Sequence, residues 1–538
     1  PAVPSRHGPS MPSMSDRPRP ARWRPRVSGR AAAALVSAAA LTGCTSLATP
    51  PGDRPTAVPA PAAWTSVRPA GAVPDDLAGW WTRFGDPALA PLVQQALDAG
   101  TDVAAAQARL RQARAARELA DAGLRPHLGG SGSGQGSWRE GAGGSESWRA
   151  GLDASWEIDL WGAGAAGVRA AEATERASAL TLEATRVTVA AEVALTLLQL
   201  RGTQVREAIA RRSLVAQEQT LAIARWRHEA GLVTALDVEQ AASAVETTRA
   251  QIPALRSSAA QSLHALGVLV GRAPGALQDE LAATRDAALP RVPADLALAL
   301  PADVLRQRPD VQAAEQRVAA AAARVEQTDA GRLPSLSLGG SIGLSALSLS
   351  GLGSGAGVAS LLASVSMPVL DAGRLQAQVR QQEAARDEAL QAWRAVVLAA
   401  LQEVEDALVA IAAAREQLAA QQAAADAARR AAAIADQRYR SGLVDFQNVL
   451  QSQRSLLAAE DAVAATTTTL ASAHVRLVKA LGGGWTPAAP APSGRQDVSA
   501  ARPRSPVPAP AASAANPPVA DAVGDAAVSS TAADPTLR

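Results

Sequence analysis

The stretch from Trp148 to Leu160 alternates strictly between apolar side chains at even positions and charged or small ones at odd positions. A period of two predicts a β-strand with one apolar face. Serines alternate with aliphatic residues in a similar way from Ser335 to Ser345, and the apolar positions expected on a return strand are Leu361, Ala363, Val365, Met367 and Val369. The sequence therefore predicts two β-hairpins, at about 126–161 and 334–370.

Tryptophans mark the ends of the first apolar face. Trp148 and Trp156 lie about 26 Å apart at ~3.3 Å per residue, near the height of a lipid-facing band with aromatic girdles. We expect Trp138 to mirror Trp148 across a loop over 139–147. A soluble sheet with one buried face is the alternative, but nothing else in the chain offers a layer to cover it.

Long helices flank these hairpins. The run Arg374–Arg440 holds 67 residues with neither Gly nor Pro, which as a helix is roughly 100 Å long. A turn at Gly442 reverses the chain into a second run, Leu443–Leu481, and a helix over Asp310–Gly331 precedes the hairpin. The two shorter helices, laid end to end, nearly match the long one. We therefore expect a long antiparallel tube wall and no compact core.

The whole pattern occurs twice. Asp102 and Pro126 match Asp310 and Pro334 at an offset of 208. Further on the offset is 211, for Gly162 with Gly373, Gly231 with Gly442, and Gly271 with Gly482. The chain is thus a tandem duplication of about 170 residues, and each half is expected to form the same unit of helix, hairpin, long helix, turn and helix.

The N-terminal region has the pattern of a bacterial export signal. Ala31–Leu41 is apolar but too short to span a bilayer as a stable helix. Cys44, the only cysteine, follows in the sequence Leu-Thr-Gly-Cys, which resembles a lipobox. We expect translation to start at Met11 or Met14, and Cys44 to be lipidated, with palmitate among its acyl chains; a free buried cysteine is the alternative. The basic residues before the apolar run are Arg17, Arg19, Arg22, Arg24, Arg26 and Arg30.

Composition suggests where the chain divides. Low-complexity Pro/Ala-rich stretches predict tethers and linkers, and the patternless tail predicts disorder. The expected segments are a lead-in and signal peptide (1–43), a lipid-anchored tether (44–78), a first repeat (79–272), a linker or equatorial region (273–302), a second repeat (303–485) and a disordered tail (486–538).

Catalytic chemistry is not visible in the sequence. A net charge of +2 gives no electrostatic case for nucleic acid. The Gly-rich stretches lie at hairpins and not at phosphate-binding loops. No enzyme activity, metal or cofactor is predicted, apart from the covalent lipid on Cys44. The histidines, which have no metal-ligand spacing, are His7, His127, His228, His264 and His474.

A set of motifs in fixed order resembles the TolC-like outer-membrane efflux proteins, and among them the NodT-type outer-membrane efflux lipoproteins. The set covers the chain from about Trp80 to Trp485. Its members are Trp80–Pro87, Ser155–Gly162, Leu269–Gly275, Arg308–Val311, Arg438–Gly442 and Lys479–Trp485.

The resemblance implies an α+β membrane protein with a TolC-like internal duplication. Four strands cannot close a barrel and lipid tolerates no open edge, so other copies must complete it. Bacterial barrels start at about eight strands, so two copies are conceivable. The resemblance implies a homotrimer, with a 12-stranded outer-membrane β-barrel continued by a long α-helical periplasmic barrel. It also implies an equatorial ring around the middle of the tube, formed in part by 273–302.

The function implied by the resemblance is that of an outer-membrane factor in a tripartite efflux system. The chain would be a passive exit duct for drugs or other small molecules, working with a periplasmic adaptor (membrane fusion) protein and an RND-type inner-membrane transporter. One alternative is the channel of a type I protein secretion system. A structural periplasmic coiled-coil protein or an adaptor is a third interpretation, which the hairpins and the lipobox disfavour.

The helix-reversing turns at Gly231 and Gly442 are expected at the periplasmic tip, far from the barrel. Glycine suits a turn because positive φ is easy there, and the simplest interpretation of both is as turns only.

The residues around the second turn are interpreted as a gate. In the resembled family, acidic residues on the following helix often form a ring around the pore. The matching positions here, Asn448 and Gln451, are neutral, which leaves Asp445 to supply any cation preference. We expect the resting pore to be held shut by Arg438 and Tyr439 and by packing around Phe446, and to be only weakly cation-selective.

Overall fold

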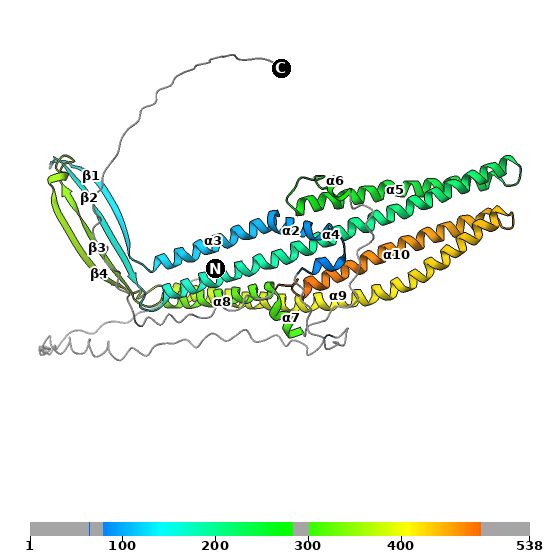
Figure 1. Ribbon diagram of the computed structural model, residues 1–538. Coiled ribbons are helices and arrows are strands. Elements are labelled where there is room, and N and C mark those ends of the chain that lie inside the picture. Colours follow the sequence, from blue (N-terminus) through cyan, green and yellow to red (C-terminus); the bar gives the residue numbers. More distant parts are fainter. Residues whose placement is uncertain (1–63, 65–78, 142, 283–300, 486–538) are drawn as a thin grey trace, which may run out of the picture. The chain divides into compact units, whose positions relative to one another are not determined.

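The computed structural model describes residues 64, 79–141, 143–282 and 301–485, all within one unit of the chain (Figure 1). Cys44, the signal peptide, nearly all of the tether, the tail and most of the linker lie outside the described residues. The elements are η1 (Trp80–Phe84), α2 (Leu89–Ala99), α3 (Thr101–Gly123), β1 (His127–Arg139), β2 (Gly143–Ile158), α4 (Ala163–Glu229), α5 (Ala235–Leu269), α6 (Gln278–Ala282), α7 (Pro301–Gln307), α8 (Pro309–Ala330), β3 (Ser335–Ala346), η2 (Leu352–Ser354), β4 (Ala356–Ser366), α9 (Arg374–Arg440) and α10 (Phe446–Ala480).

The two long helices have the same length. α9 spans the 67 residues of the Gly- and Pro-free run, as predicted, and α4 in the first half also has 67. Each begins directly after a glycine in the left-handed conformation, Gly162 (φ 77°) or Gly373 (φ 82°). α10 starts at Phe446 and not at Leu443, because the residues after Gly442 form the turn itself.

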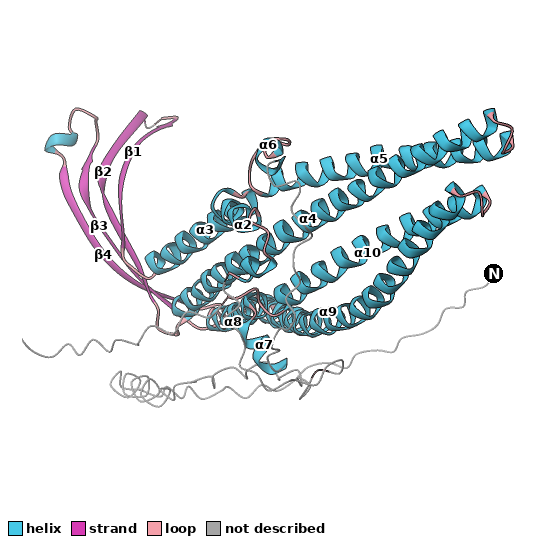
Figure 2. Ribbon diagram, turned by 45° about the vertical axis from the view of Figure 1, so that its right-hand side comes forward, coloured by secondary structure: helices cyan, strands magenta, loops and turns pink. Residues whose placement is uncertain are grey.

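The shorter helices lie along the long ones in pairs (Figure 2). α3 and α5 pack on α4, and α8 and α10 pack on α9. α4 also packs on α8 and α10, which joins the two halves. At Gly202 of α4 an added Cβ would collide with the side chain of Thr468 on α10, so a small residue is required for this close approach.

The four strands form one antiparallel sheet in the order β1-β2-β3-β4, next to the ends of α3, α4, α8 and α9 (Figure 1). One face carries exposed apolar side chains such as Leu152 and Ile342. On the other face Ser337 and Ser341 share hydrogen bonds of 2.8 Å with Ser364 and Ser360. Among the strands that the structure describes, β1 and β4 each have one unpaired edge.

Two details of the strands differ from the sequence prediction. Trp138 does not mirror Trp148, because β1 continues to Arg139 and β2 already begins at Gly143. Trp138 pairs instead with Gly144, and Trp148 pairs with Gly134, whose missing side chain leaves room for the indole ring. β4 ends at Ser366, so the apolar positions Met367 and Val369 lie beyond the strand.

A buried ion pair holds the segment before the first repeat helix. Arg201 of α4 donates from Nε to Asp86 Oδ2 at 2.9 Å, and both side chains are buried. Trp80 and Phe84 of η1 are buried in the same hydrophobic core, together with Leu89 and other residues of α2. The sequence predicted neither η1 nor α2, since their stability comes from packing on α4.

Arg308 explains the motif that opens the second repeat. Its guanidinium donates to both carboxylate oxygens of Asp310 (2.7 and 3.0 Å), to Glu403 of α9 (2.7 Å) and to the backbone carbonyl of Ala480 (3.0 Å). One side chain thereby joins α8, α9 and the end of α10. The helices of the described ranges include none that is long and apolar enough to cross a membrane.

Candidate gate at the helix-reversing turns

Both long helices end in the same hydrogen-bonded turn. After α4, the amides of Gly231 and Leu232 donate to the carbonyls of His228 (2.9 Å) and Arg227 (2.8 Å). After α9, Gly442 and Leu443 donate in the same way to Tyr439 and Arg438, both at 2.9 Å. This is the Schellman arrangement, which places a left-handed residue after the helix. Gly231 and Gly442 have φ of 72° and 74°, and an added Cβ would meet nothing, so the backbone conformation alone requires glycine.

The helices that follow the two turns are capped differently. Thr234 and Asp237 form a reciprocal capping box at the start of α5. The residue equivalent to Thr234, 211 positions on, is Asp445, which precedes α10 but makes no side-chain cap. Its exposed carboxylate makes no hydrogen bond or ion pair with the described residues.

Two of the predicted gate residues lie in a hydrophobic core at the turns. The rings of Tyr439 and Phe446 are 5.9 Å apart in an edge-to-face arrangement, and both side chains are buried. Residues from three helices surround them: Leu221 and Ala224 of α4, Ala241, Ala244 and Val245 of α5, and Val449 and Leu450 of α10. The end of α9 is therefore packed against both halves of the chain.

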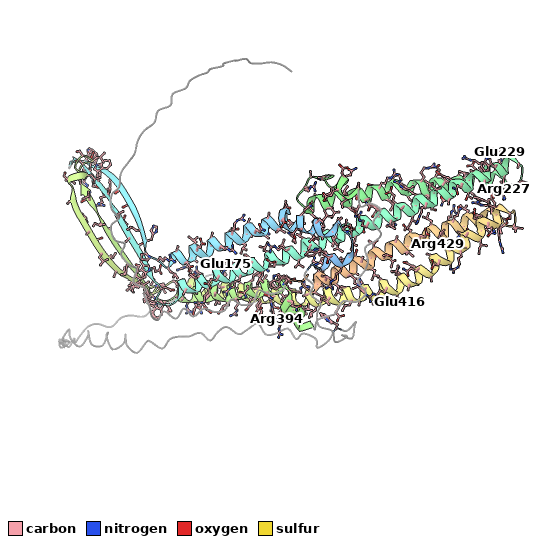
Figure 3. The ribbon with its side chains drawn as sticks, viewed as in Figure 1. Glu175, Arg227, Glu229, Arg394, Glu416 and Arg429 are labelled. Carbon is pink, nitrogen blue, oxygen red and sulfur yellow. The ribbon has the colours of Figure 1, made fainter. Side chains whose placement is uncertain are left out.

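Arg227 is the residue at the turns that sequence reasoning missed. Its guanidinium carbon lies 4.2 Å from the centre of the Tyr439 ring, a cation–π distance. Its Nη2 also donates to the carbonyls of Tyr439 (2.6 Å) and Arg440 (3.2 Å). Figure 3 shows Arg227 and Glu229 near the end of α4 that is far from the strands. Arg227 thus ties the end of α4 to the end of α9.

Arg438, predicted to help hold the pore shut, makes no such tie within the chain. Its side chain is exposed and has no hydrogen bond or ion pair to any residue that the structure describes. The adjacent Tyr439 takes the buried face of α9, which turns Arg438 outward. The signal that would have found Arg227 was available, because it is the counterpart of Arg438 at the 211-residue offset.

The hydroxyl of Tyr439 is buried without a hydrogen-bond partner among the described residues. Burial raises the pKa of this phenol, and the nearby Arg227 guanidinium opposes the rise in part. Asn448 and Gln451, by contrast, are exposed on the face of α10 away from Phe446. Of the six predicted gate residues, the structure brings together Tyr439 and Phe446 and leaves the other four at the surface.

Ion pairs join neighbouring long helices further from the turns. Arg206 of α4 makes a bidentate pair with Asp461 of α10, at 2.7 and 3.0 Å, which raises the pKa of the arginine. Arg429 of α9 donates to Glu460 of α10 at 3.0 Å (Figure 3). Within the described ranges, no three His, Cys, Asp or Glu side chains are grouped so that they could hold a metal ion.

Comparison with known proteins places this geometry in a family. The sequence model of the outer membrane efflux proteins matches residues 92–272 and 300–483. The chain is similar to the pyoverdine export outer membrane protein OpmQ of Pseudomonas aeruginosa, with 34% identity over 475 residues, 84% of this chain and 96% of that protein. It is 28% identical over 418 residues to nodulation protein T of Rhizobium leguminosarum bv. trifolii, covering 77% and 89% of the two chains.

The fold is also that of a solved channel. The structure of the outer-membrane channel OprN is similar with a TM-score of 0.73 and 33% identity, covering 80% of this chain and 98% of that one. The sheet and the paired long helices therefore define an outer-membrane efflux channel with a TolC-like fold, whose helices extend into the periplasm. The chain belongs to the outer membrane efflux protein family, a family of channels.

Proposed function

We propose that three copies of this chain form a closed 12-stranded barrel in the outer membrane and a helical tube in the periplasm. The observation that carries this proposal is the four-stranded sheet with an exposed apolar face and two unpaired edges. An unpaired strand edge in lipid leaves backbone groups without hydrogen bonds, at a cost of several kcal/mol per group. A neighbouring β4 pairing with β1 removes that cost.

The helices support the same assembly. α4 packs between α3 and α5 on one side and α8 and α10 on the other. α9 packs on α8 and α10 and forms the outer edge of this layer of helices. Apolar side chains stay exposed on α9 (Leu398, Val409) and on α3 (Leu119). A second copy that sets its α3 and α5 against α9 covers them.

Native mass spectrometry of detergent-extracted protein tests the stoichiometry. We expect a trimer that forms ion-conducting pores in planar bilayers. A monodisperse monomer that conducts would contradict the proposal.

The trimer is proposed to act as the passive exit duct of a tripartite pump, with a periplasmic adaptor and an RND-type transporter supplying coupling and energy. The similarity to a pyoverdine export protein supports a small-molecule cargo. Deleting the gene should raise accumulation of a fluorescent pump substrate in cells, and plasmid-borne protein should reverse it. A deletion that changes only the pattern of secreted proteins would favour type I secretion instead.

The tie between Arg227 and Tyr439, with Phe446 packed beneath it, is proposed to keep the periplasmic end shut at rest. Asp445, exposed and uncapped, is proposed to give the open pore a weak cation preference beside the neutral Asn448 and Gln451. Reversal potentials measured in a KCl gradient should shift toward zero for Asp445→Ala. An unchanged reversal potential would show that the selectivity lies elsewhere.

Lipidation of Cys44 is proposed to anchor the N-terminus in the outer membrane. Cys44→Ser should block both acylation and signal cleavage, so intact-mass measurement should find a longer, unlipidated chain. An unlipidated mature N-terminus in the wild-type protein would refute the assignment.

A further inference from the structure

The connections between the strands and the helices carry unusually exposed apolar side chains. We call this set the collar; it consists of Leu160, Trp161, Leu333, Met367, Val369 and Leu370. Val369 is 92% and Leu370 93% exposed. Water-exposed apolar residues scattered singly need no explanation, but a contiguous group marks a contact surface.

The collar continues the apolar face of the sheet. Leu361, Ala363 and Val365 alternate along β4 on the face opposite the serine ladder, and Met367 and Val369 continue that alternation beyond its end. The apolar positions thus reach into the connection between β4 and α9. After β2, which ends at Ile158, Leu160 continues the sequence alternation of Trp156 and Ile158.

Two indoles at this level have their polar atoms occupied and their rings available. Trp161 Nε1 donates to the carbonyl of Pro334 at 2.7 Å, and Trp156 Nε1 donates to that of Leu124 at 2.9 Å. An indole with a bonded N–H and an open ring suits the boundary between acyl chains and water, where tryptophan is enriched.

Packing of one connection against another leaves apolar side chains of the collar exposed. In the first half, the β2–α4 connection already has the α8–β3 connection beside it, bonded through Trp161. Leu160 and Trp161 nevertheless stay 55% and 52% exposed.

Arginines flank the collar. Arg125 follows α3 and Arg374 is the first residue of α9; both are exposed, and neither has an ion pair within the part of the chain that the structure describes. Arg332, after α8, is paired with Asp329 at 2.8 Å. Guanidinium groups at this position match the phosphates of lipid headgroups.

We propose that the collar lies in the periplasmic leaflet of the outer membrane, with its apolar side chains at the acyl boundary and Arg125 and Arg374 on headgroup phosphates. This inference rests on the proposed location of the sheet in the outer membrane. It places the membrane boundary at the first turn of α9 and not at the end of β4.

Site-directed spin labelling in lipid nanodiscs tests the depth. Leu370→Cys is labelled in the full chain, with Leu152→Cys on the sheet and Leu443→Cys at the distant turn (74% exposed) as references. Unsubstituted protein, whose Cys44 is expected to be acylated and unreactive, gives the labelling background. We expect the label at 370 to be more accessible to oxygen than to a water-soluble nickel chelate, as at 152, and the label at 443 to show the reverse.

Three other outcomes would overturn the proposal. If the label at 370 is accessible to water like the label at 443, while the label at 152 reports lipid, the collar lies outside the membrane although the sheet lies in it. A label at 370 accessible to neither reagent shows that a second copy covers it. If the label at 152 also reports water, the proposed location of the sheet in the outer membrane is itself refuted.

The arginines are tested by competition between anionic and neutral lipid. Native mass spectrometry counts the phosphatidylglycerol retained from an equal mixture with phosphatidylcholine. Arg125→Gln and Arg374→Gln should each lower the preference for the anionic lipid about fivefold, since one basic residue near the surface contributes about 1 kcal/mol. Arg438→Gln, equally exposed but at the far turn, is the matched control. An equal loss in the control, or none in the collar variants, would refute the headgroup contact.

Discussion

Removing Arg227 isolates the contribution of the tie between α4 and α9. Arg227→Ala deletes a cation–π contact at 4.2 Å and two charge-assisted hydrogen bonds to the carbonyls of Tyr439 and Arg440. Since the side chain is only half-buried, water offsets part of each interaction. We take the tie to stabilise the closed state by about 2 kcal/mol per chain. Its loss changes the closed-to-open ratio of one chain about thirty-fold.

Single-channel recording in planar bilayers measures this change directly. We expect the resting open probability of Arg227→Ala to rise by at least tenfold, because the core around Phe446 still opposes opening. Arg438→Ala is the control, since it occupies the equivalent position in the second half but has no partner among the described residues. Equal opening by both variants, or none by Arg227→Ala, would refute the assignment of the tie.

Three further changes test the packing and the ionisation of the helices. Tyr439→Phe removes a buried hydroxyl without a partner in the described part of the chain, so resting conductance should be unchanged and Tm equal or higher; a lower Tm would reveal a hidden bond. Arg201→Ala should cost about 3–5 kcal/mol in denaturant unfolding, because it leaves the buried Asp86 carboxylate uncompensated; a loss below 1 kcal/mol would contradict this. Burial lowers the pKa of His474, so the unfolded chain takes up its proton first. The stability that neutral His474 contributes above pH ~6.5, the usual pKa of histidine, is therefore lost as the pH falls toward its lower pKa in the folded state. His474→Gln should make Tm depend less on pH between 7 and 5. An unaltered slope of Tm against pH would show that other groups set it.

The elements were largely predictable because their signals are local. An uninterrupted run without Gly or Pro fixed the bounds of α9, and the alternation of side chains located the strands. The offset of 211 located both turns. These features depend on backbone preference and on periodicity, which are properties of short segments of sequence.

The contacts between distant residues were not predictable in the same way. Asp86 and Arg201 are 115 positions apart, and Arg227 and Tyr439 are 212 apart. Which of two equivalent arginines bonds depends on how α4 and α9 come together, and no local pattern records this. The register of Trp138 was missed for a related reason, since a strand can continue through a glycine-rich stretch that resembles a loop.

The tie at the turns joins residues that are not counterparts of each other, and this bears on the history of the chain. Arg227 and Arg438 are counterparts, as are His228 and Tyr439. Arg227 of the first half meets Tyr439 of the second, while His228 turns to the carbonyl of Val233, 3.1 Å away in its own turn. Both halves therefore carry the arginine, but only the second carries the aromatic acceptor. A ring of six identical half-length chains built from the first repeat alone would therefore lack this lock, because the first repeat has His228 where the second has Tyr439.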